Sequence, residues 1–258
     1  MTADLFLVGR ELAAGVGAGD LVDLSGPEGR HAVSVKRLQV GERIDLADGA
    51  GTVLRASVEA LTGRDSLRAR VRERITSPLP QPRIVVVQAL AKGQRGETAV
   101  ETLTEVGVDV IVPWQAERCI ARWTGERAAS GHAKWAATAR ASGKQARRAW
   151  FPEVAALAGT VEVHRLVAAA ACAIVLHEQA DAPIREVPLP ADGDVVLIVG
   201  PEGGISPAEL AGLTSVGARP VRLGPTVMRT STAGTVAAGV VLAATERWAS
   251  QRVADSWP

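Results

Sequence analysis

The segment Gly200-Pro201-Glu202-Gly203-Gly204 has the residue types of a ligand-binding loop. It follows the apolar run 195–199 and precedes Ser206-Pro207, a pair typical of a helix start because serine caps a helix and proline fits its first turn. Ligands of open α/β sheets bind at the carboxyl ends of strands, and glycines let a ligand approach the backbone closely. The same four letters recur at Gly26-Pro27-Glu28-Gly29 without such a context, so a plain tight turn stays an alternative.

A second candidate loop follows the short strand predicted over residues 221–223. Gly224-Pro225 leads to Arg229 and then to Thr230-Ser231-Thr232. A guanidinium carries a fixed positive charge that stabilises an anion, whereas the hydroxyls are typical helix caps. On these residues alone, a surface arginine and a simple cap are as well supported as a site. The following helix, from Gly234 to about Trp248, is made almost wholly of small apolar residues as far as residue 244, which predicts burial nearly all round.

The elements that position these loops alternate between strand and helix, which predicts a mostly parallel α/β sheet. A third strand, predicted over residues 173–176, ends at His177-Glu178. Gly107 marks the end of a helix predicted over residues 97–106. The predicted strands of this part are 84–87, 108–112, 173–176, 195–199 and 221–223.

Three prolines at alternate positions within residues 77–82 predict a linker, because proline cannot continue a helix or enter a central strand. Residues 1–76 before it read as a small β-rich domain, a barrel or a sandwich, with strands over 42–46, 52–58 and 67–75. An Asp48-Gly49 turn joins the first two of these strands. Residues 83–258 form the predicted second domain.

The composition excludes several classes of function. The chain has 258 residues and a net charge of +1, so bulk charge gives no sign of a nucleic-acid partner, but residues 127–152 contain basic residues and no acidic one. The isolated Cys119 and Cys172 favour a reduced, cytoplasmic setting, and no apolar run is long enough to span a membrane. Four scattered histidines make a metal site improbable, and no phosphate-binding loop or Gly-x-Ser-x-Gly sequence is present.

Taken together, these segments resemble the signature of the RsmE family of SPOUT-class methyltransferases. The resemblance rests on the loop 200–204, on Leu223-Gly224-Pro225 and on Met228-Arg229-Thr230, and it covers nearly the whole chain. Further matches are residues 31–38, 40–42, 48–49, 92–93 and 104–107, then Glu117-Arg118, Gln145, Arg148 and Pro152.

The resemblance implies a C-terminal SPOUT domain, with a mostly parallel sheet and a trefoil knot, behind a small N-terminal β-barrel PUA-like RNA-binding domain. It implies S-adenosylmethionine-dependent methylation of N3 of a uridine in 16S rRNA within the assembled small ribosomal subunit. It also implies a homodimer with each site near the subunit interface.

The resemblance further implies that the methyl donor lies among three loops. The cofactor-binding residues would be Leu176, His177, Ile198, Val199, Gly200, Pro201, Glu202, Gly203, Gly204, Leu223, Gly224, Val227, Met228 and Thr232. Ser231 stands where the family commonly has glutamate, and Lys144 replaces a common acidic residue, so roles that need a carboxylate there do not transfer.

Three groups of cations are candidates for RNA binding, each with a solvated charged face as the alternative. Arg68, Arg70, Arg72 and Arg74 alternate along one predicted strand, and Arg140, Lys144 and Arg148 are spaced by four as on one helix face. His31, Lys36, Arg37 and Lys92 are included from the resemblance alone.

Methyl transfer from a sulfonium needs a lone pair, an in-line approach and a dry pocket. Uracil N3 releases its lone pair by losing a proton, so the site has to remove that proton or stabilise the resulting anion. Arg229 suits the second task, and Glu202 is either a base or a residue that holds Arg229. The alternatives are a ribose 2′-O methyltransferase of the same class and a non-catalytic RNA-binding assembly factor.

Overall fold

The computed structural model describes residues 3–249 and divides into two compact units. The first comprises the described residues up to Leu79 together with Gly143–Phe151, and the second comprises Pro80–Ser142 and the described residues from Pro152 onward. The domain bounds 1–76, 77–82 and 83–258 stay a prediction, and residues 1–2 and 250–258 lie outside the described part.

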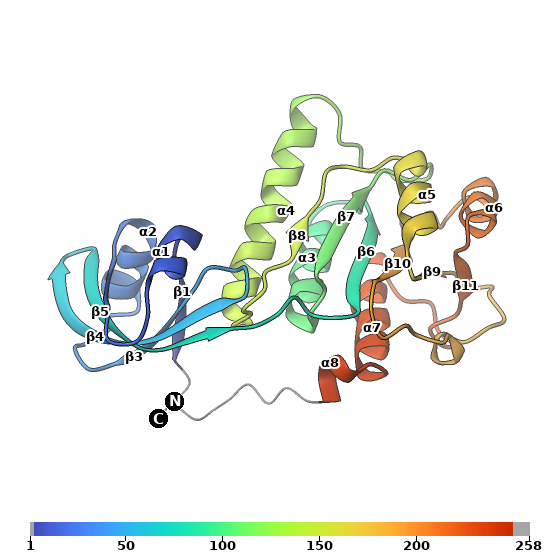
Figure 1. Ribbon diagram of the computed structural model, residues 1–258. Coiled ribbons are helices and arrows are strands. Elements are labelled where there is room, and N and C mark those ends of the chain that lie inside the picture. Colours follow the sequence, from blue (N-terminus) through green and yellow to red (C-terminus); the bar gives the residue numbers. More distant parts are fainter. Residues whose placement is uncertain (1–2, 250–258) are drawn as a thin grey trace. The chain divides into compact units, whose positions relative to one another are not determined.

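The first unit is built on one five-stranded sheet in the order β1-β3-β4-β5-β2 (Figure 1). Its strands are β1 (Asp4–Leu7), β2 (Leu21–Leu24), β3 (Arg43–Ala47), β4 (Thr52–Gly63) and β5 (Ser66–Thr76). All pairings are antiparallel except that of β1 with β3. Two short helices, α1 (Arg10–Gly15) and α2 (Gly26–Arg30), precede a π-helical turn at His31–Val35. Alternate apolar side chains from the strands form a core, with Phe6, Ile44, Leu46, Leu54 and Leu67 fully buried.

The turn between β3 and β4 is the predicted Asp-Gly turn. The Asp48 carboxylate accepts hydrogen bonds from the amides of Ala50 (2.7 Å) and Thr52 (3.0 Å), as short acidic side chains do in turns. Gly49 and Gly51 take positive φ angles of 69° and 100°, a region that favours glycine.

The segment Gly143–Phe151 packs on this turn. The indole Nε1 of Trp150 donates to the Ser77 carbonyl oxygen at 3.1 Å, and the Phe151 amide donates to the Gly49 carbonyl oxygen at 3.0 Å. A Cβ on Gly51 would lie 2.7 Å from the Trp150 ring, so only glycine allows this approach. The segment therefore belongs to the first unit, although Pro80–Ser142 of the second unit precede it.

The second unit holds a six-stranded sheet in the order β11-β9-β10-β6-β7-β8, and all its pairings are parallel. Its strands are β6 (Arg83–Ala89), β7 (Val110–Trp114), β8 (Glu153–Val154), β9 (Cys172–Leu176), β10 (Asp194–Val199) and β11 (Arg219–Val221). The central strands are continuous apolar runs because both faces of the sheet are covered. The predicted α/β fold class, with a β-rich N-terminal part and a parallel C-terminal sheet, is confirmed, while the trefoil knot stays a prediction.

Helices cover this sheet (Figure 1). They are α3 (Arg95–Val106), α4 (Glu126–Gln145), α5 (Thr160–Ala169), α6 (Pro207–Ser215), α7 (Thr230–Ala243) and α8 (Glu246–Ala249), with a 3-10 turn at Ile184–Glu186. Gly107 ends α3 in the left-handed conformation, as predicted. None of the described helices is long and apolar enough to cross a membrane.

Several predicted boundaries were wrong. The last strand ends at Val221 rather than Leu223, β7 begins at Val110 rather than Val108, and the last long helix begins at Thr230 rather than Gly234. This helix also ends at Ala243, with the short α8 after it. The hydroxyl residues that were interpreted as a loop therefore form the first turn of α7, where the Thr230 hydroxyl donates to the Gly200 carbonyl oxygen and the Thr232 hydroxyl donates to that of Arg229.

Candidate active site

The first loop of the site leaves β10 and turns sharply. Gly204 has a φ of 73°, and its amide donates to the Pro201 carbonyl oxygen at 2.9 Å. The predicted capping box is present, because the Glu209 amide donates to the Ser206 hydroxyl and the Ser206 amide donates to the Glu209 carboxylate, both at 3.2 Å. The loop between a buried strand and a firmly capped helix is thus fixed at both ends.

The second loop is joined to the first through Thr230. The Thr230 hydroxyl donates to the Gly200 carbonyl oxygen at 2.6 Å and accepts from the Gln88 side-chain amide at 3.1 Å. Gln88 is fully buried on β6. These bonds link the end of β10, the start of α7 and the neighbouring strand, so the two loops are held at a fixed separation.

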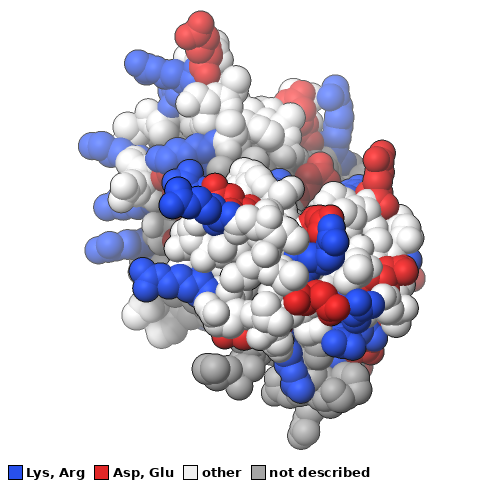
Figure 2. Space-filling view, turned by 90° about the vertical axis from the view of Figure 1, so that its left-hand side faces the viewer, with Lys and Arg blue, Asp and Glu red and all other residues white. Residues whose placement is uncertain are grey.

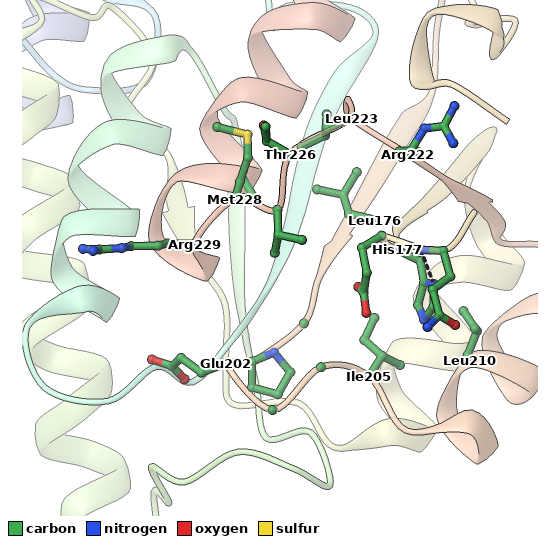
Figure 3. A pocket seen from close by; sticks show the side chains of 18 of the residues that line it. Leu176, His177, Glu202, Ile205, Leu210, Arg222, Leu223, Thr226, Met228 and Arg229 are labelled. Carbon is green, nitrogen blue, oxygen red and sulfur yellow. Dashed lines mark hydrogen bonds between the residues drawn. The ribbon is translucent and has the colours of Figure 1, made fainter. Parts of the chain in front are cut away.

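The three predicted loops converge on one cavity of about 950 Å³ (Figure 3). This volume lies within the range of roughly 300–1,000 Å³ that is usual for small-molecule sites. Residues predicted from the sequence that line it are Leu176, His177, Gly200, Pro201, Glu202, Gly203, Gly204, Leu223, Gly224, Val227, Met228 and Arg229.

Three of the predicted cofactor residues do not line the cavity. Ile198 and Val199 are buried in β10, so their side chains belong to the core of the sheet. Thr232 is exposed, and its hydroxyl donates to the Arg229 carbonyl oxygen at 3.2 Å within the first turn of α7.

Several lining residues were missed. Arg95 comes from the start of α3, and Arg118 comes from the loop after β7. Ile205, in the turn before α6, and Leu210, on α6, supply apolar surface. Arg222 lies just after β11. Arg95 and Arg118 are more than 80 residues from the glycine loop in sequence, so no local pattern marks them, although the pair Glu117-Arg118 contributed to the family resemblance.

Glu202 is an ionised carboxylate that accepts hydrogen bonds from two neighbouring residues. Its Oε1 accepts from the Lys92 amide at 3.2 Å and from the Arg95 guanidinium at 3.3 Å. Burial acts to raise the pKa of Glu202, but hydrogen bonds from its own amide and that of Lys92, together with Arg95, outweigh it and lower the pKa below the usual value. A carboxylate with a lowered pKa is a weak base, and among the described residues its ion-pair partner is Arg95 rather than Arg229.

Arg229 is the N-cap residue of α7, and its side chain is exposed. No described side chain forms an ion pair with it. In Figure 3, Arg229 and Glu202 extend toward the same side of the cavity, whereas Leu176, His177 and Ile205 lie on the other. The site thus combines an apolar, glycine-lined pocket with an uncompensated guanidinium at its edge.

The predicted basic strand face is partly neutralised. Arg68 forms a two-bond ion pair with Asp23 (2.7 and 2.9 Å), and Arg70 forms one with Glu59 (2.8 and 3.0 Å). Arg72 and Arg74 donate to neutral oxygens, those of Ser57 and Ala14. Figure 2 shows basic side chains projecting along the left edge of one face of the molecule, with acidic and basic side chains mixed toward its right. Arg72 and Arg74 therefore keep more uncompensated charge for RNA than Arg68 and Arg70.

The three cations predicted to share a helix face do not do so. Helix α4 ends at Gln145, and Arg147 takes a φ of 55°, so Arg148 lies beyond the helix and donates to the Trp150 carbonyl oxygen. Lys144 is also engaged, since its ammonium contacts both oxygens of Glu28 at 2.7 and 2.9 Å. Of the three predicted cations, only Arg140 is an exposed residue of α4.

The residues placed by resemblance alone lie on exposed or half-buried positions. The His31 ring stacks obliquely on Phe6, with centroids 5.9 Å apart, and Lys36 pairs with Asp4 at 2.9 Å. Arg37 has a left-handed φ of 57°, and Lys92 is exposed at the start of the α3 region. Their role in RNA binding stays a prediction.

Comparison with known proteins defines the class. Residues 77–242 match the family model of an RNA methyltransferase domain, and residues 24–72 match that of an RNA methyltransferase PUA domain. The chain is therefore an RNA methyltransferase with an N-terminal PUA domain.

Individual relatives define the family. The chain is 46% identical over 252 residues to Ribosomal RNA small subunit methyltransferase E of Mycobacterium bovis. The aligned residues cover 96% of this chain and 94% of that protein. The chain therefore belongs to the RsmE family of ribosomal RNA small subunit methyltransferases.

Solved structures agree with this assignment. A putative methyltransferase from Legionella pneumophila, in complex with S-adenosylmethionine, is 29% identical with a TM-score of 0.83 and covers 95% of this chain and 99% of its own. Ribosomal RNA small subunit methyltransferase E from Neisseria gonorrhoeae, at 24% identity and a TM-score of 0.82, covers 95% of this chain and 98% of its own and supports the fold.

Proposed function

We propose that this protein transfers a methyl group from S-adenosylmethionine to N3 of a uridine in 16S rRNA, within the assembled small ribosomal subunit. The observation that carries the proposal is the convergence of three strand-end loops on one cavity, with Arg229 at its edge. The relative from Legionella pneumophila binds the same cofactor on this fold.

The residues present fit this cofactor. Glycines 200, 203, 204 and 224 expose backbone groups to the cavity, and a Cβ on Gly224 would meet no heavy atom within 4 Å, so the backbone there is open to a ligand. Leu176, Leu223 and Ile205 supply apolar walls. Backbone amides and carbonyls suit adenine and ribose, and the apolar walls exclude water from the transfer.

The cofactor supplies an electrophilic methyl carbon. The chain has to bring N3 in line with it and to stabilise the negative charge that spreads over N3 and the flanking oxygens when the N3 proton leaves. Arg229 meets the second need because its charge is fixed and has no ion-pair partner among the described residues. Glu202 acts through the loop: it holds Lys92 and Arg95 against the glycine turn.

Two further points belong to this proposal. A homodimer is supported by an apolar stripe on α7 and α8, where Val236, Val240 and Trp248 are 40%, 36% and 53% exposed. A cytoplasmic location follows from the proposed substrate, the small ribosomal subunit.

The test combines binding and product analysis. Calorimetry should show stoichiometric binding of S-adenosylmethionine to the protein. Small subunits from a strain lacking this protein should gain N3-methyluridine in 16S rRNA when they are incubated with the purified protein and S-adenosylmethionine. A ribose-methylated product would favour the 2′-O alternative. Failure of the protein to bind the cofactor would favour a non-catalytic assembly factor.

A further inference from the structure

Four guanidiniums line the cavity: Arg95, Arg118, Arg222 and Arg229. Two carboxylates, Glu178 and Glu202, also line it, and among the described residues Glu202 forms its ion pair with Arg95. Arg95 is thus largely neutralised, whereas Arg118, Arg222 and Arg229 have no ion-pair partner among the described residues. The proposed function uses Arg229 and leaves Arg118 and Arg222 without a role. Of these two, Arg118 is the one that is hydrogen-bonded to the glycine loop.

Arg118 packs against the glycine loop. Its guanidinium donates to the Gly203 carbonyl oxygen at 3.3 Å, and a Cβ on Gly203 would lie 3.2 Å from the Arg118 Cβ and from its carbonyl oxygen. The side chain is nevertheless exposed, and the neighbouring Glu117 forms no ion pair with it among the described residues. One hydrogen bond to a neutral oxygen leaves most of the five donors of the guanidinium unused.

We propose that Arg118 binds a phosphodiester of the RNA substrate next to the target uridine and so positions that base over the cofactor loop. The inference rests on the proposed function. A guanidinium fork matches a phosphate oxygen pair, and a fixed, exposed charge at a cavity edge attracts a polyanion. Because the same side chain holds Gly203, the phosphate and the cofactor loop are placed by one residue.

A second anion is available in principle, the carboxylate of the cofactor, and the experiment separates the two. Arg118→Gln removes the charge and keeps a side chain that can donate to Gly203. Arg118→Lys keeps the positive charge but loses the planar, bidentate donor geometry of the guanidinium. Arg165→Gln is the matched control, since Arg165 is exposed on α5, forms an ion pair with Glu162 and does not line the cavity.

Each variant is assayed with unmethylated small subunits for KM and kcat over a range of salt concentrations, and by calorimetry for S-adenosylmethionine. We expect Arg118→Gln to raise KM for the subunit about tenfold, to reduce the slope of log affinity against log salt by about 0.7, and to change cofactor affinity less than twofold. Arg118→Lys should retain the slope, and Arg165→Gln should match the wild type.

Weaker cofactor binding with an unchanged subunit KM would assign Arg118 to the cofactor and overturn the inference. No change in either quantity would overturn it as well. If the wild-type protein itself transfers no methyl group, the proposed function fails. If the wild type transfers and Arg118→Gln transfers equally well, the inference alone fails.

Discussion

The hydroxyl of Thr230 donates a 2.6 Å hydrogen bond to the carbonyl oxygen of Gly200. These two residues lie 30 positions apart, at the start of α7 and at the end of β10. The bond connects the loop that carries Arg229 to the glycine loop. The distance between the cofactor pocket and its guanidinium is therefore set by a backbone-anchored contact, not by two independent loops.

Replacing Thr230 with valine keeps the shape of the side chain and removes this bond. We expect the free energy of unfolding to fall by about 1–3 kcal/mol, because the Gly200 oxygen and the Gln88 amide both lose a partner. The affinity for S-adenosylmethionine should fall as well. Denaturant unfolding and calorimetry measure the two effects.

Thr214→Val is the control for this variant, since the Thr214 hydroxyl donates only to Leu210 within α6. Equal stability and cofactor affinity in Thr230→Val and the wild type would show that the two loops are held by other contacts.

Glu202→Gln tests whether this carboxylate is a base. Hydrogen bonds outweigh burial and lower its pKa below the usual 4.5, so the group is ionised at neutral pH and protonates only below that value. The stability that it contributes is therefore present above pH 4.5 and is lost as the pH falls through the lowered pKa. We expect kcat of the variant at pH 7.5 to fall less than tenfold, with an unchanged pH profile between pH 6 and 9.

Removing a general base costs about 10²–10⁴-fold in rate. A loss of that size in Glu202→Gln, with loss of the pH dependence, would restore the role of base to Glu202.

Lys144 is expected to stabilise the first unit instead of binding RNA. Its ammonium bonds both oxygens of Glu28, and both side chains are only about one-fifth exposed. Lys144→Ala should lower the free energy of unfolding by about 1–3 kcal/mol, since a charged hydrogen-bonded pair loses one partner. The salt dependence of subunit binding should stay unchanged.

Arg140→Ala is the comparison for this variant, because Arg140 is exposed and carries no described ion pair. A weaker salt dependence in Lys144→Ala than in Arg140→Ala would contradict the structural role.

The glycine loop of the site could be predicted because the signals that define it lie in adjacent residues. The capping box of Ser206 and Glu209 and the strand before it placed the glycine loop at a strand end, and the structure brings it to the cavity. What the sequence could not show are contacts between distant segments, such as Arg95 with Glu202 or Thr230 with Gly200.

The prediction of a basic helix face was wrong for a different reason. The spacing of Arg140, Lys144 and Arg148 fits a helix, but no glycine or proline directly follows the last residue of α4, Gln145. The chain leaves the helix there because Trp150 and Phe151 pack on the Gly49–Gly51 turn. Tertiary packing overrides the local periodicity at this point.

The rate of a single turnover in Arg229→Gln, at saturating S-adenosylmethionine and with unmethylated small subunits, tests the proposed site most directly. Arg219→Gln, at an exposed position on β11 outside the cavity, is the control. We expect the Arg229 variant to lose at least about 10²-fold in rate, as for removal of one anion-stabilising donor, while its cofactor affinity stays within threefold of the wild type. A wild-type rate in Arg229→Gln would contradict the placement of the uridine beside this guanidinium.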